Sequence, residues 1–414
     1  MQVIQLEEEV EKELTRDEFD DASALALDKS GRFEVEFPSV KNGYRYVVRS
    51  KGWIGHIPVS PNVVVDVRPK MPVATIFGML EVAYNLKSFE LLEGQTHVNT
   101  IEEMFQRLAA ILASRVIDRA RKGLFQTYLS HREDLSFVRG RVDVRESLKR
   151  SMQGSPYLHC EFQQLTHDVE DNHLLLWTLY VVSRAGPGRP DVARLVRQAY
   201  RALSGHVSLT EKQSDDCINR FYHRLNEDYR PLHGLCRLLL DHLGPDMERG
   251  EHLFLPFMLN MPSLFELFVA EWLKRHAADQ WIVTSQHTAK LKANADLTFR
   301  IDLFLKDKRS GVPIAILDTK YKATELPTES DIQQVIAYAV ECGVDRAFLV
   351  YPSNRARPVK VEVGAIEVVS IAFDIAAKLE AEGQRFIEQL VSLLPNRAIS
   401  LGGGSSSGMS PVNI

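Results

Sequence analysis

The chain has 414 residues, of which 45% are hydrophobic, so it can form two or three domains with a substantial buried core. Lys and Arg number 50 against 55 Asp and Glu, and the net charge of -5 argues against a protein that coats nucleic acid along its whole surface. The acidity belongs to one end, because residues 1–21 hold nine acids and two bases, whereas the rest of the chain holds 48 bases and 46 acids. The charge count therefore does not exclude a local basic groove that binds nucleic acid.

The four cysteines and the apolar runs exclude other classes of protein. Cys160, Cys217, Cys236 and Cys342 are far apart and form no CxxC pair, so we expect neither a zinc site nor a disulfide framework. The N-terminus has acids where a secretory signal has bases. The longest apolar run, 174–182, is far short of the roughly 20 residues that span a bilayer. We expect a cytoplasmic protein with no membrane segment.

After an acidic segment over 1–21, the chain is predicted to form a β-rich domain over 22–95. Strand-like runs of apolar and aromatic residues, bounded by turn residues, cover 33–37, 44–48, 53–57 and 63–67. The Ser-Lys-Gly turn before Trp53 predicts that the second and third runs form a hairpin. Lys51 and Trp53 are therefore candidates for contact with a partner. The alternative is a solvated hairpin with Trp53 packed on its own sheet.

The middle region, 96–250, is predicted to be mainly helical. From Thr100 the apolar residues recur at helical spacing, and Thr100 with Glu103 fits a capping box, in which the two side chains bond free amides at the helix start. Further helices are predicted over 172–183, 191–203 and 218–243. A Gly-Pro-Gly-Arg-Pro break separates the first two of these three helices.

A basic stretch follows the first of these helices, with ten bases between Arg115 and Arg150. Cations near a helix C-terminus are favoured by the helix dipole, which explains the first few without any ligand. Because ten exceeds what capping requires, contact with DNA phosphates stays open. The candidate DNA-binding residues are Arg115, Arg119, Arg121, Lys122, Arg139 and Arg141.

A C-terminal domain is predicted over 251–395, followed by a disordered, Gly- and Ser-rich tail over 396–414. Its predicted elements are a helix at 263–276, strands at 281–285, 295–305 and 313–321, a helix at 331–342, a strand at 347–351, a strand pair within 359–371, and a helix at 374–393. This αβββαβ order predicts a compact mixed sheet with flanking helices. The predicted fold class is α+β with several domains.

A candidate catalytic site is predicted where two of these strands pair. Asp302 lies in the middle of one strand, and Asp318 and Lys320 share a face of the next. A hairpin of the two strands brings two carboxylates and an amine together. Carboxylate oxygens suit Mg²⁺, which activates water and offsets charge on a phosphate, while the ammonium orients the nucleophile. The alternative is a salt bridge on an exposed sheet face.

Two further features extend this group. Glu266, on the preceding helix, is a candidate third metal ligand, although Ser263 and Glu266 also have the spacing of a capping box. Gln334 and Tyr338 are four residues apart on one face of the later helix, which can pack over the site or simply face solvent.

Together these residues resemble the PD-(D/E)xK nuclease superfamily: Glu266, Asp302, the Asp-x-Lys pair Asp318 and Lys320, then Gln334 and Tyr338. Within it, the chain resembles the McrC-like nuclease subunits of McrBC modification-dependent restriction systems. The supporting stretches are SLFELFVAEWL, RIDLFL, AILDTKYKA, DIQQVIAYA and YLSHREDLSFVRGRVDV, and the segment 168–176. Ile301 stands where the superfamily's name has Pro. The resemblance covers most of residues 40–375.

The resemblance implies a Mg²⁺-dependent endonuclease acting on double-stranded DNA, with Asp302, Asp318 and Glu266 as metal ligands. It also implies a McrB-like AAA+ GTPase partner that recognises methylated DNA and is stimulated by this subunit, whose N-terminal part docks into the ring. Consistent with a separate motor, the chain has no GxxxxGK[ST] phosphate loop. Two alternatives remain: an activating adaptor whose nuclease-like domain does not cleave, and a stand-alone RecB-like nuclease. Self-association is left open.

Overall fold

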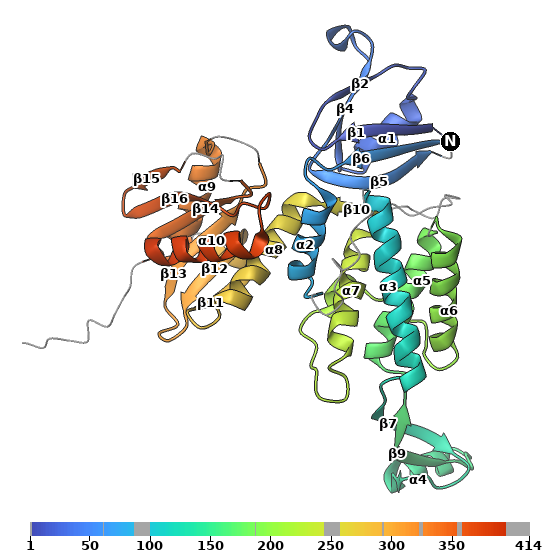
Figure 1. Cartoon of the computed structure of the whole chain (residues 1–414). Coiled ribbons are helices and arrows are strands. Elements are labelled where there is room, and N and C mark those ends of the chain that lie inside the picture. Colours follow the sequence, from blue (N-terminus) through green and yellow to red (C-terminus); the bar gives the residue numbers. More distant parts are fainter. Residues whose placement is uncertain are drawn as a thin grey trace, which may run out of the picture. The chain divides into compact units, whose positions relative to one another are not determined.

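The computed structural model (Figure 1) describes residues 2–60, 62–86, 100–186, 188–243, 257–291, 294–322, 326–353 and 358–394. The chain forms two compact units, Met1–Phe268 and Val269–Ile414, and helix α8 (Met261–His276) runs across the division between them. The predicted α+β class with several sheets is confirmed. The predicted tail over 396–414 lies outside the described residues.

All four cysteines are free in the structure. Among the helices that the structure describes, none combines the length and hydropathy needed to cross a bilayer.

Two small sheets begin the first unit. The first has the order β1 (Gln2–Glu7), β6 (Val63–Arg68), β5 (Trp53–Ser60) and β10 (Phe257–Asn260), with β1 parallel to β6 and the other pairs antiparallel. The second has the order β2 (Lys12–Leu14), β4 (Tyr46–Ser50) and β3 (Phe33–Glu36). The acidic segment 1–21 therefore contains two strands, β1 and β2, which were not predicted from its acidic composition. Strand β10, which follows the predicted start of the C-terminal domain at 251, completes a sheet of the first unit.

Helices α1 (Asp21–Lys29) and α2 (Val73–Ala83) accompany these sheets and were not predicted. Asp20 caps α1 by accepting a hydrogen bond from the Ser23 backbone N–H at 2.7 Å. Most of α2 is buried, so it lacks the polar stripe by which a surface helix is recognised in a sequence.

The predicted hairpin of β4 and β5 is wrong, because the two strands belong to different sheets. Gly52 lies between them with a φ of 71°, in the left-handed region that glycine adopts without strain. Its carbonyl accepts a hydrogen bond from the Met261 backbone N–H at 2.9 Å, and an added Cβ would lie 2.9 Å from Pro262. Gly52 is thus buried against the start of α8, whereas Lys51 beside it is exposed and Trp53 is half-buried.

The helical part of the first unit is built from α3 (Ile101–Lys122), α5 (Glu170–Ala185), α6 (Pro190–Ser204) and α7 (Tyr229–His242). The capping box of Thr100 and Glu103 is confirmed at the start of α3. The prediction of helix over 218–228 is wrong. Asn219 has a φ of 55°, which a helix cannot accommodate, and Pro231 is favoured only in a first turn, which is where α7 places it.

The middle region is mainly helical as predicted, but a small lobe, residues 127–166, interrupts its helices with a sheet that was not predicted. The lobe consists of β7 (Thr127–Leu135), β8 (Arg141–Val142), α4 (Val144–Met152) and β9 (Leu158–Thr166), with β9 in the middle of the sheet. Gly140, with a φ of 69°, lets β8 approach β9, since an added Cβ would lie 2.4 Å from the Glu161 carbonyl oxygen.

Two buried histidines of α7 make the first unit sensitive to acid. His242 lies within hydrogen-bond distance of the Met258 carbonyl at 3.1 Å, and His233 of the Asp171 carbonyl at 3.0 Å. Because a carbonyl only accepts, each ring donates from that nitrogen. Burial lowers the pKa of each ring from 6.5 to about 4. Folding therefore favours the neutral rings, by about 3 kcal/mol each above pH 6.5, and this stability is lost as the pH falls toward 4.

We expect His242→Asn to reduce this acid sensitivity. The fall in melting temperature between pH 7 and pH 5 should be several degrees smaller in the variant than in the wild type, because one buried ring no longer has to take up a proton. Thermal melts at the two pH values measure it. His206→Asn is the matched control, since His206 is exposed. An unchanged pH dependence in His242→Asn would show that the buried ring does not set it.

The second unit is built on one sheet of order β11-β12-β13-β14-β16-β15. Its strands are β11 (Trp281–Leu291), β12 (Asn294–Asp307), β13 (Pro313–Thr319), β14 (Arg346–Tyr351), β15 (Lys360–Val363) and β16 (Ile366–Ala372). β11, β12 and β13 form an antiparallel meander, and β13, β14 and β16 are parallel. The helices are α9 (Glu329–Cys342) and α10 (Leu379–Leu393). The predicted order of elements in this region is confirmed.

Helix α10 packs closely on the indole ring of Trp272. A Cβ added to Gly383 would lie 1.9 Å from Trp272 Cζ2, and Trp272 is itself fully buried against Phe373. We expect Gly383→Ala to lower the free energy of unfolding by about 3 kcal/mol, because the ring cannot retreat. Helix propensity alone predicts the opposite sign, a gain of about 1 kcal/mol. Denaturant unfolding distinguishes the two, with exposed Gln389→Ala as the control that should change stability little.

Candidate nuclease site

The antiparallel pairing of β12 and β13 brings the two predicted carboxylates together. Leu303 is paired with Leu317, and continuing this register by one residue places Asp302 opposite Asp318. The backbone pairing of β12 with β13 ends at Leu303 and Leu317. Beyond it, the Asp302 carboxylate accepts hydrogen bonds from the Thr319 backbone N–H at 2.8 Å and from the Thr319 hydroxyl at 2.9 Å. The predicted convergence of the two residues is confirmed.

Asp318 is the more buried of the two carboxylates, with 2% of its surface exposed. Burial, followed by the negative charge of Asp302, raises the pKa of Asp318 to about 6. The nearby Lys320 ammonium opposes this shift without cancelling it. The pair therefore has an excess of negative charge in a place that water does not reach freely, which favours a cation.

Lys320 reaches this carboxylate and is held in place from the other side by α9. Its Nζ lies 2.7 Å from Asp318 Oδ2 and donates to Gln334 Oε1 at 2.9 Å. Gln334 Nε2 in turn donates to the Tyr338 hydroxyl at 2.6 Å. Burial of Lys320 disfavours its charged form and would lower its pKa. The neighbouring carboxylates outweigh this effect and raise the pKa of Lys320. Gln334 and Tyr338 thus connect α9 to Lys320 as predicted, with Tyr338 buried and Gln334 at the exposed edge of the site.

Asp331 lies beside Lys320 and Tyr351 lies near the site carboxylates, and neither was predicted. Asp331 lies at the start of α9, where it forms a capping box with Thr328, and its Oδ1 is 3.6 Å from Lys320 Nζ. The spacing of Thr328 and Asp331, one turn before Gln334, was a usable signal in the sequence. Tyr351 ends β14 with 1% of its surface exposed, and burial followed by the charges of Asp331 and Asp318 raises its pKa. Only the parallel pairing of β13 with β14 brings it here.

Glu266 lies in the part of α8 that belongs to the first unit, where it is half-buried. The alternative role in a capping box with Ser263 is wrong, because α8 already begins at Met261 and the Asn260 side chain accepts the Ser263 backbone N–H at 3.2 Å. A role for Glu266 as third metal ligand stays a prediction.

The two aspartates fit a magnesium ion, on three grounds. They are hard oxygen donors, they are adjacent, and burial together with the charge of Asp302 raises the pKa of Asp318 although the Lys320 ammonium lies beside it, so a further cation would favour the ionised pair. Among the residues that the structure describes, no group of three or more His, Cys, Asp or Glu side chains is arranged to hold a metal. Mg²⁺ commonly uses only one or two carboxylates and completes its shell with waters and substrate phosphate, so two are sufficient.

The predicted DNA-binding residues are divided between two elements. Arg115, Arg119, Arg121 and Lys122 lie on the last turns of α3, and Arg139 and Arg141 lie in the lobe. Several already have partners: the Arg119 Nε is 3.2 Å from Asp228 Oδ2, and the Arg139 guanidinium lies 4.0 Å from the centre of the Phe162 ring. Contact of these residues with DNA stays a prediction.

Three comparisons place this geometry among known proteins. The model of the family described as "McrBC 5-methylcytosine restriction system component" matches residues 48–352. The "Type IV methyl-directed restriction enzyme EcoKMcrBC" of Escherichia coli (strain K12) is 22% identical over 267 residues, which are 61% of this chain and 74% of that protein. A half-complex of Thermococcus gammatolerans McrB AAA+ hexamers with bound McrC contains a similar chain, with a TM-score of 0.53 and 16% identity over 94% of this chain and 100% of that one.

The structural likeness concerns the fold alone, whereas the family match extends over most of the described chain and includes Asp302, Asp318 and Lys320. The predicted resemblance to McrC-like proteins is thereby confirmed. This chain belongs to the family of McrBC 5-methylcytosine restriction system components.

Proposed function

We propose that this chain is the Mg²⁺-dependent DNA endonuclease subunit of a modification-dependent, 5-methylcytosine-type restriction system. The observation that carries the proposal is the convergence of Asp302, Asp318 and Lys320, held from above by Gln334. Family membership supports a restriction role, and the site supplies the groups that phosphodiester hydrolysis requires.

In this proposal Asp302 and Asp318 hold Mg²⁺, which when bound lowers the pKa of a water and offsets charge on the phosphate. Lys320 keeps its proton because carboxylates surround it, so it is a hydrogen-bond donor and not the general base. Its ammonium orients the attacking water and stabilises the negative charge that develops on the phosphate oxygens. Gln334 fixes the direction of the ammonium, and Tyr338 fixes Gln334.

We further propose that a McrB-like AAA+ GTPase delivers the DNA and is stimulated by this chain in the cytoplasm. The partner is suggested by the relatives, one of which is an McrC bound to McrB AAA+ hexamers. The experiment incubates the purified chain with linear and covalently closed methylated DNA, with and without that GTPase and GTP. Cleavage that needs all components supports the proposal. GTPase stimulation without cleavage would indicate an activating adaptor. Cleavage of free DNA ends by the chain alone would indicate a stand-alone RecB-like nuclease.

The lobe, residues 127–166, is our candidate for the surface that docks on the GTPase. Val144, Leu148 and Met152 follow one another at four-residue spacing on α4, and 64%, 61% and 90% of their surfaces are exposed. The apolar stripe of this helix therefore faces solvent, the reverse of the usual arrangement. Other exposed apolar residues of the lobe are Tyr128, Leu129, Phe137, Val138, Tyr157 and Leu165.

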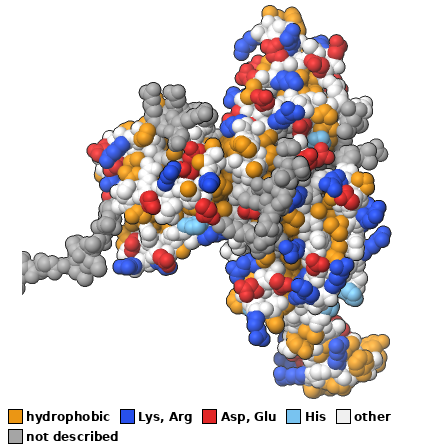
Figure 2. Space-filling model, in the orientation of Figure 1, with side chains coloured by type: hydrophobic (Ala, Val, Ile, Leu, Met, Phe, Trp, Pro, Cys, Tyr) orange, Lys and Arg blue, Asp and Glu red, His pale blue; other side chains and the backbone are white. Residues whose placement is uncertain are grey.

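Figure 2 shows hydrophobic side chains gathered on this lobe, beside Lys and Arg side chains. Contiguous exposed apolar surface with a polar rim is typical of protein interfaces. The sequence placed the docking element in the domain over 22–95, where Gly52 is buried, Trp53 is half-buried and Lys51 is exposed, and a docking role for Lys51 and Trp53 stays a prediction. We propose the lobe as the docking surface because its exposed apolar residues are not packed against any other described part of the chain.

A further inference from the structure

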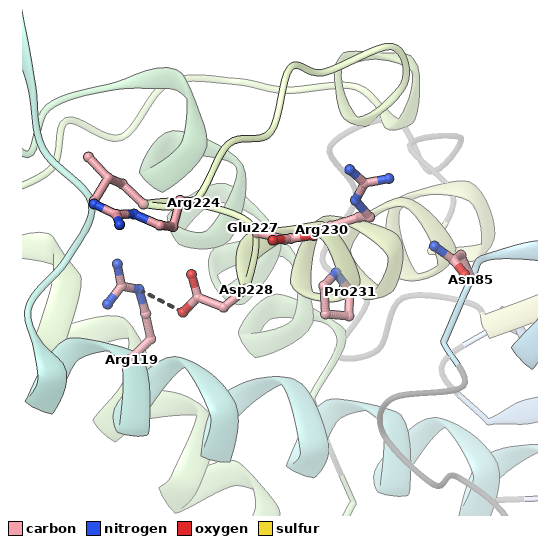
Figure 3. Close-up of a pocket in the computed structure, with 8 residues that line it drawn as sticks. Asn85, Arg119, Arg224, Glu227, Asp228, Arg230 and Pro231 are labelled. Carbon is pink, nitrogen blue, oxygen red and sulfur yellow. Dashed lines mark ion pairs between the residues drawn. The ribbon is translucent and has the colours of Figure 1, made fainter.

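A second candidate site lies wholly within the first unit, at the base of the lobe. A cavity of about 870 Å³ opens between the last turns of α3, the loop before α7 and the first turn of α7. Figure 3 shows it, and its lining residues are Asn85, Arg119, Arg224, Leu225, Glu227, Asp228, Arg230 and Pro231. The volume is that of a site for a ligand of nucleotide size.

Cations outnumber anions in this lining. Arg119 has one carboxylate partner, Asp228, whose side chain is 57% exposed. Arg224 is exposed, and it has no ion-pair partner within the residues that the structure describes. In Figure 3 the guanidinium groups of Arg119 and Arg224 are directed toward each other beside Asp228. Two like charges that face one another across a cavity favour an anion between them.

Two of the three arginines stack on tyrosine rings. The Arg119 guanidinium lies 5.1 Å from the centre of the Tyr229 ring, and Arg230 lies 4.9 Å from that of Tyr222. Tyr229 is fully buried, and its hydroxyl accepts from the Phe125 backbone N–H at 2.9 Å and donates to the Asn172 side chain at 2.8 Å. Arg119 is therefore positioned by the core before any ligand binds, which lowers the entropic cost of binding on its side of the pocket.

We propose that this pocket binds one phosphate group. Guanidinium groups match the geometry of phosphate oxygens and bind them in a bidentate manner, and the N-terminus of α7 adds the positive end of its dipole. Glu227 and Asp228 also line the pocket, so the proposal places one phosphate of the ligand on the side where the Arg119 and Arg224 guanidinium groups lie. The phosphate belongs to a DNA backbone or to a free nucleotide, which present the same chemistry.

The test uses the full chain with two probes, an unmethylated 20-base-pair duplex and GTP. Arg224→Glu reverses the charge of a residue whose side chain supports no packing, and Arg201→Glu on the exposed surface of α6 is the matched control. Fluorescence anisotropy at 50 and 200 mM salt measures duplex binding, and calorimetry measures GTP binding. Melting temperatures confirm that both variants are folded.

We expect Arg224→Glu to weaken one probe at least tenfold while Arg201→Glu stays within twofold of the wild type. A loss for the duplex, with a salt slope smaller by about one, identifies a backbone phosphate. A loss for GTP with unchanged duplex binding identifies a free nucleotide. The proposal is overturned if Arg224→Glu binds both probes as the wild type does, or if the wild type binds neither.

Discussion

Asp318→Asn is expected to abolish DNA cleavage, lowering the rate by roughly 10³-fold or more in the presence of the partner GTPase, GTP and Mg²⁺. The substitution keeps the shape of the side chain but removes the buried charge that, with Asp302, is proposed to hold the metal. GTPase stimulation and partner binding should be unchanged, because the site lies in the second unit and the lobe in the first. Conversion of covalently closed DNA to nicked and linear forms measures the loss.

The variant must remain folded for this result to count. The folded protein raises the pKa of Asp318 to about 6, so the ionised carboxylate destabilises the metal-free protein above that pH. Asp318→Asn is therefore expected to melt no lower than the wild type at pH 8. Asp345→Asn, at an exposed aspartate of the same unit, is the matched control and should cleave normally. Retained nicking by Asp318→Asn would contradict the assignment of this carboxylate.

The second large effect is expected in the lobe. Leu148→Glu places a charge in the middle of the exposed apolar stripe of α4, and binding to the GTPase should weaken about 100-fold because the carboxylate is desolvated in the interface. Stimulation of GTP hydrolysis should fall in parallel. The fold should be unaffected, since Leu148 is 61% exposed and Glu is a good helix former.

Val40→Glu is the matched comparison for the lobe, because Val40 is 81% exposed and lies in the domain where the sequence placed docking. If Leu148→Glu binds normally and Val40→Glu does not, the N-terminal domain and not the lobe is the docking surface. Titration of each variant with the GTPase, followed by analytical ultracentrifugation or anisotropy, distinguishes the two.

Sequence patterns were sufficient to predict the structure wherever the interacting residues are close in sequence. The capping box of Thr100 and Glu103 needed only four residues to fix the start of α3. A short turn between β12 and β13 was enough to predict that Asp302 and Asp318 converge. The same patterns failed at Gly52, because whether two consecutive strands pair depends on which other strands compete for their edges.

The apolar stripe of α4 could not be interpreted from its spacing. Val144, Leu148 and Met152 have the periodicity of a buried helix face, and hydrophobic periodicity does not state whether a partner within the chain covers that face. In the structure the three-stranded sheet of the lobe packs on the other side of α4, where Ser147 is buried, and the stripe is left exposed.

The sequence by itself determined the residue types and the order of elements of the candidate site, because Asp302, Asp318, Lys320, Gln334 and Tyr338 lie on elements whose patterns are strong. Only the tertiary structure brought Asp331 to Lys320 and Tyr351 near Asp318, placed Arg119 and Arg224 in the lining of one pocket, and left the apolar stripe of α4 exposed. These contacts depend on parallel strand pairing and helix packing between distant segments. Such contacts follow from the burial of the whole core, which no local pattern encodes.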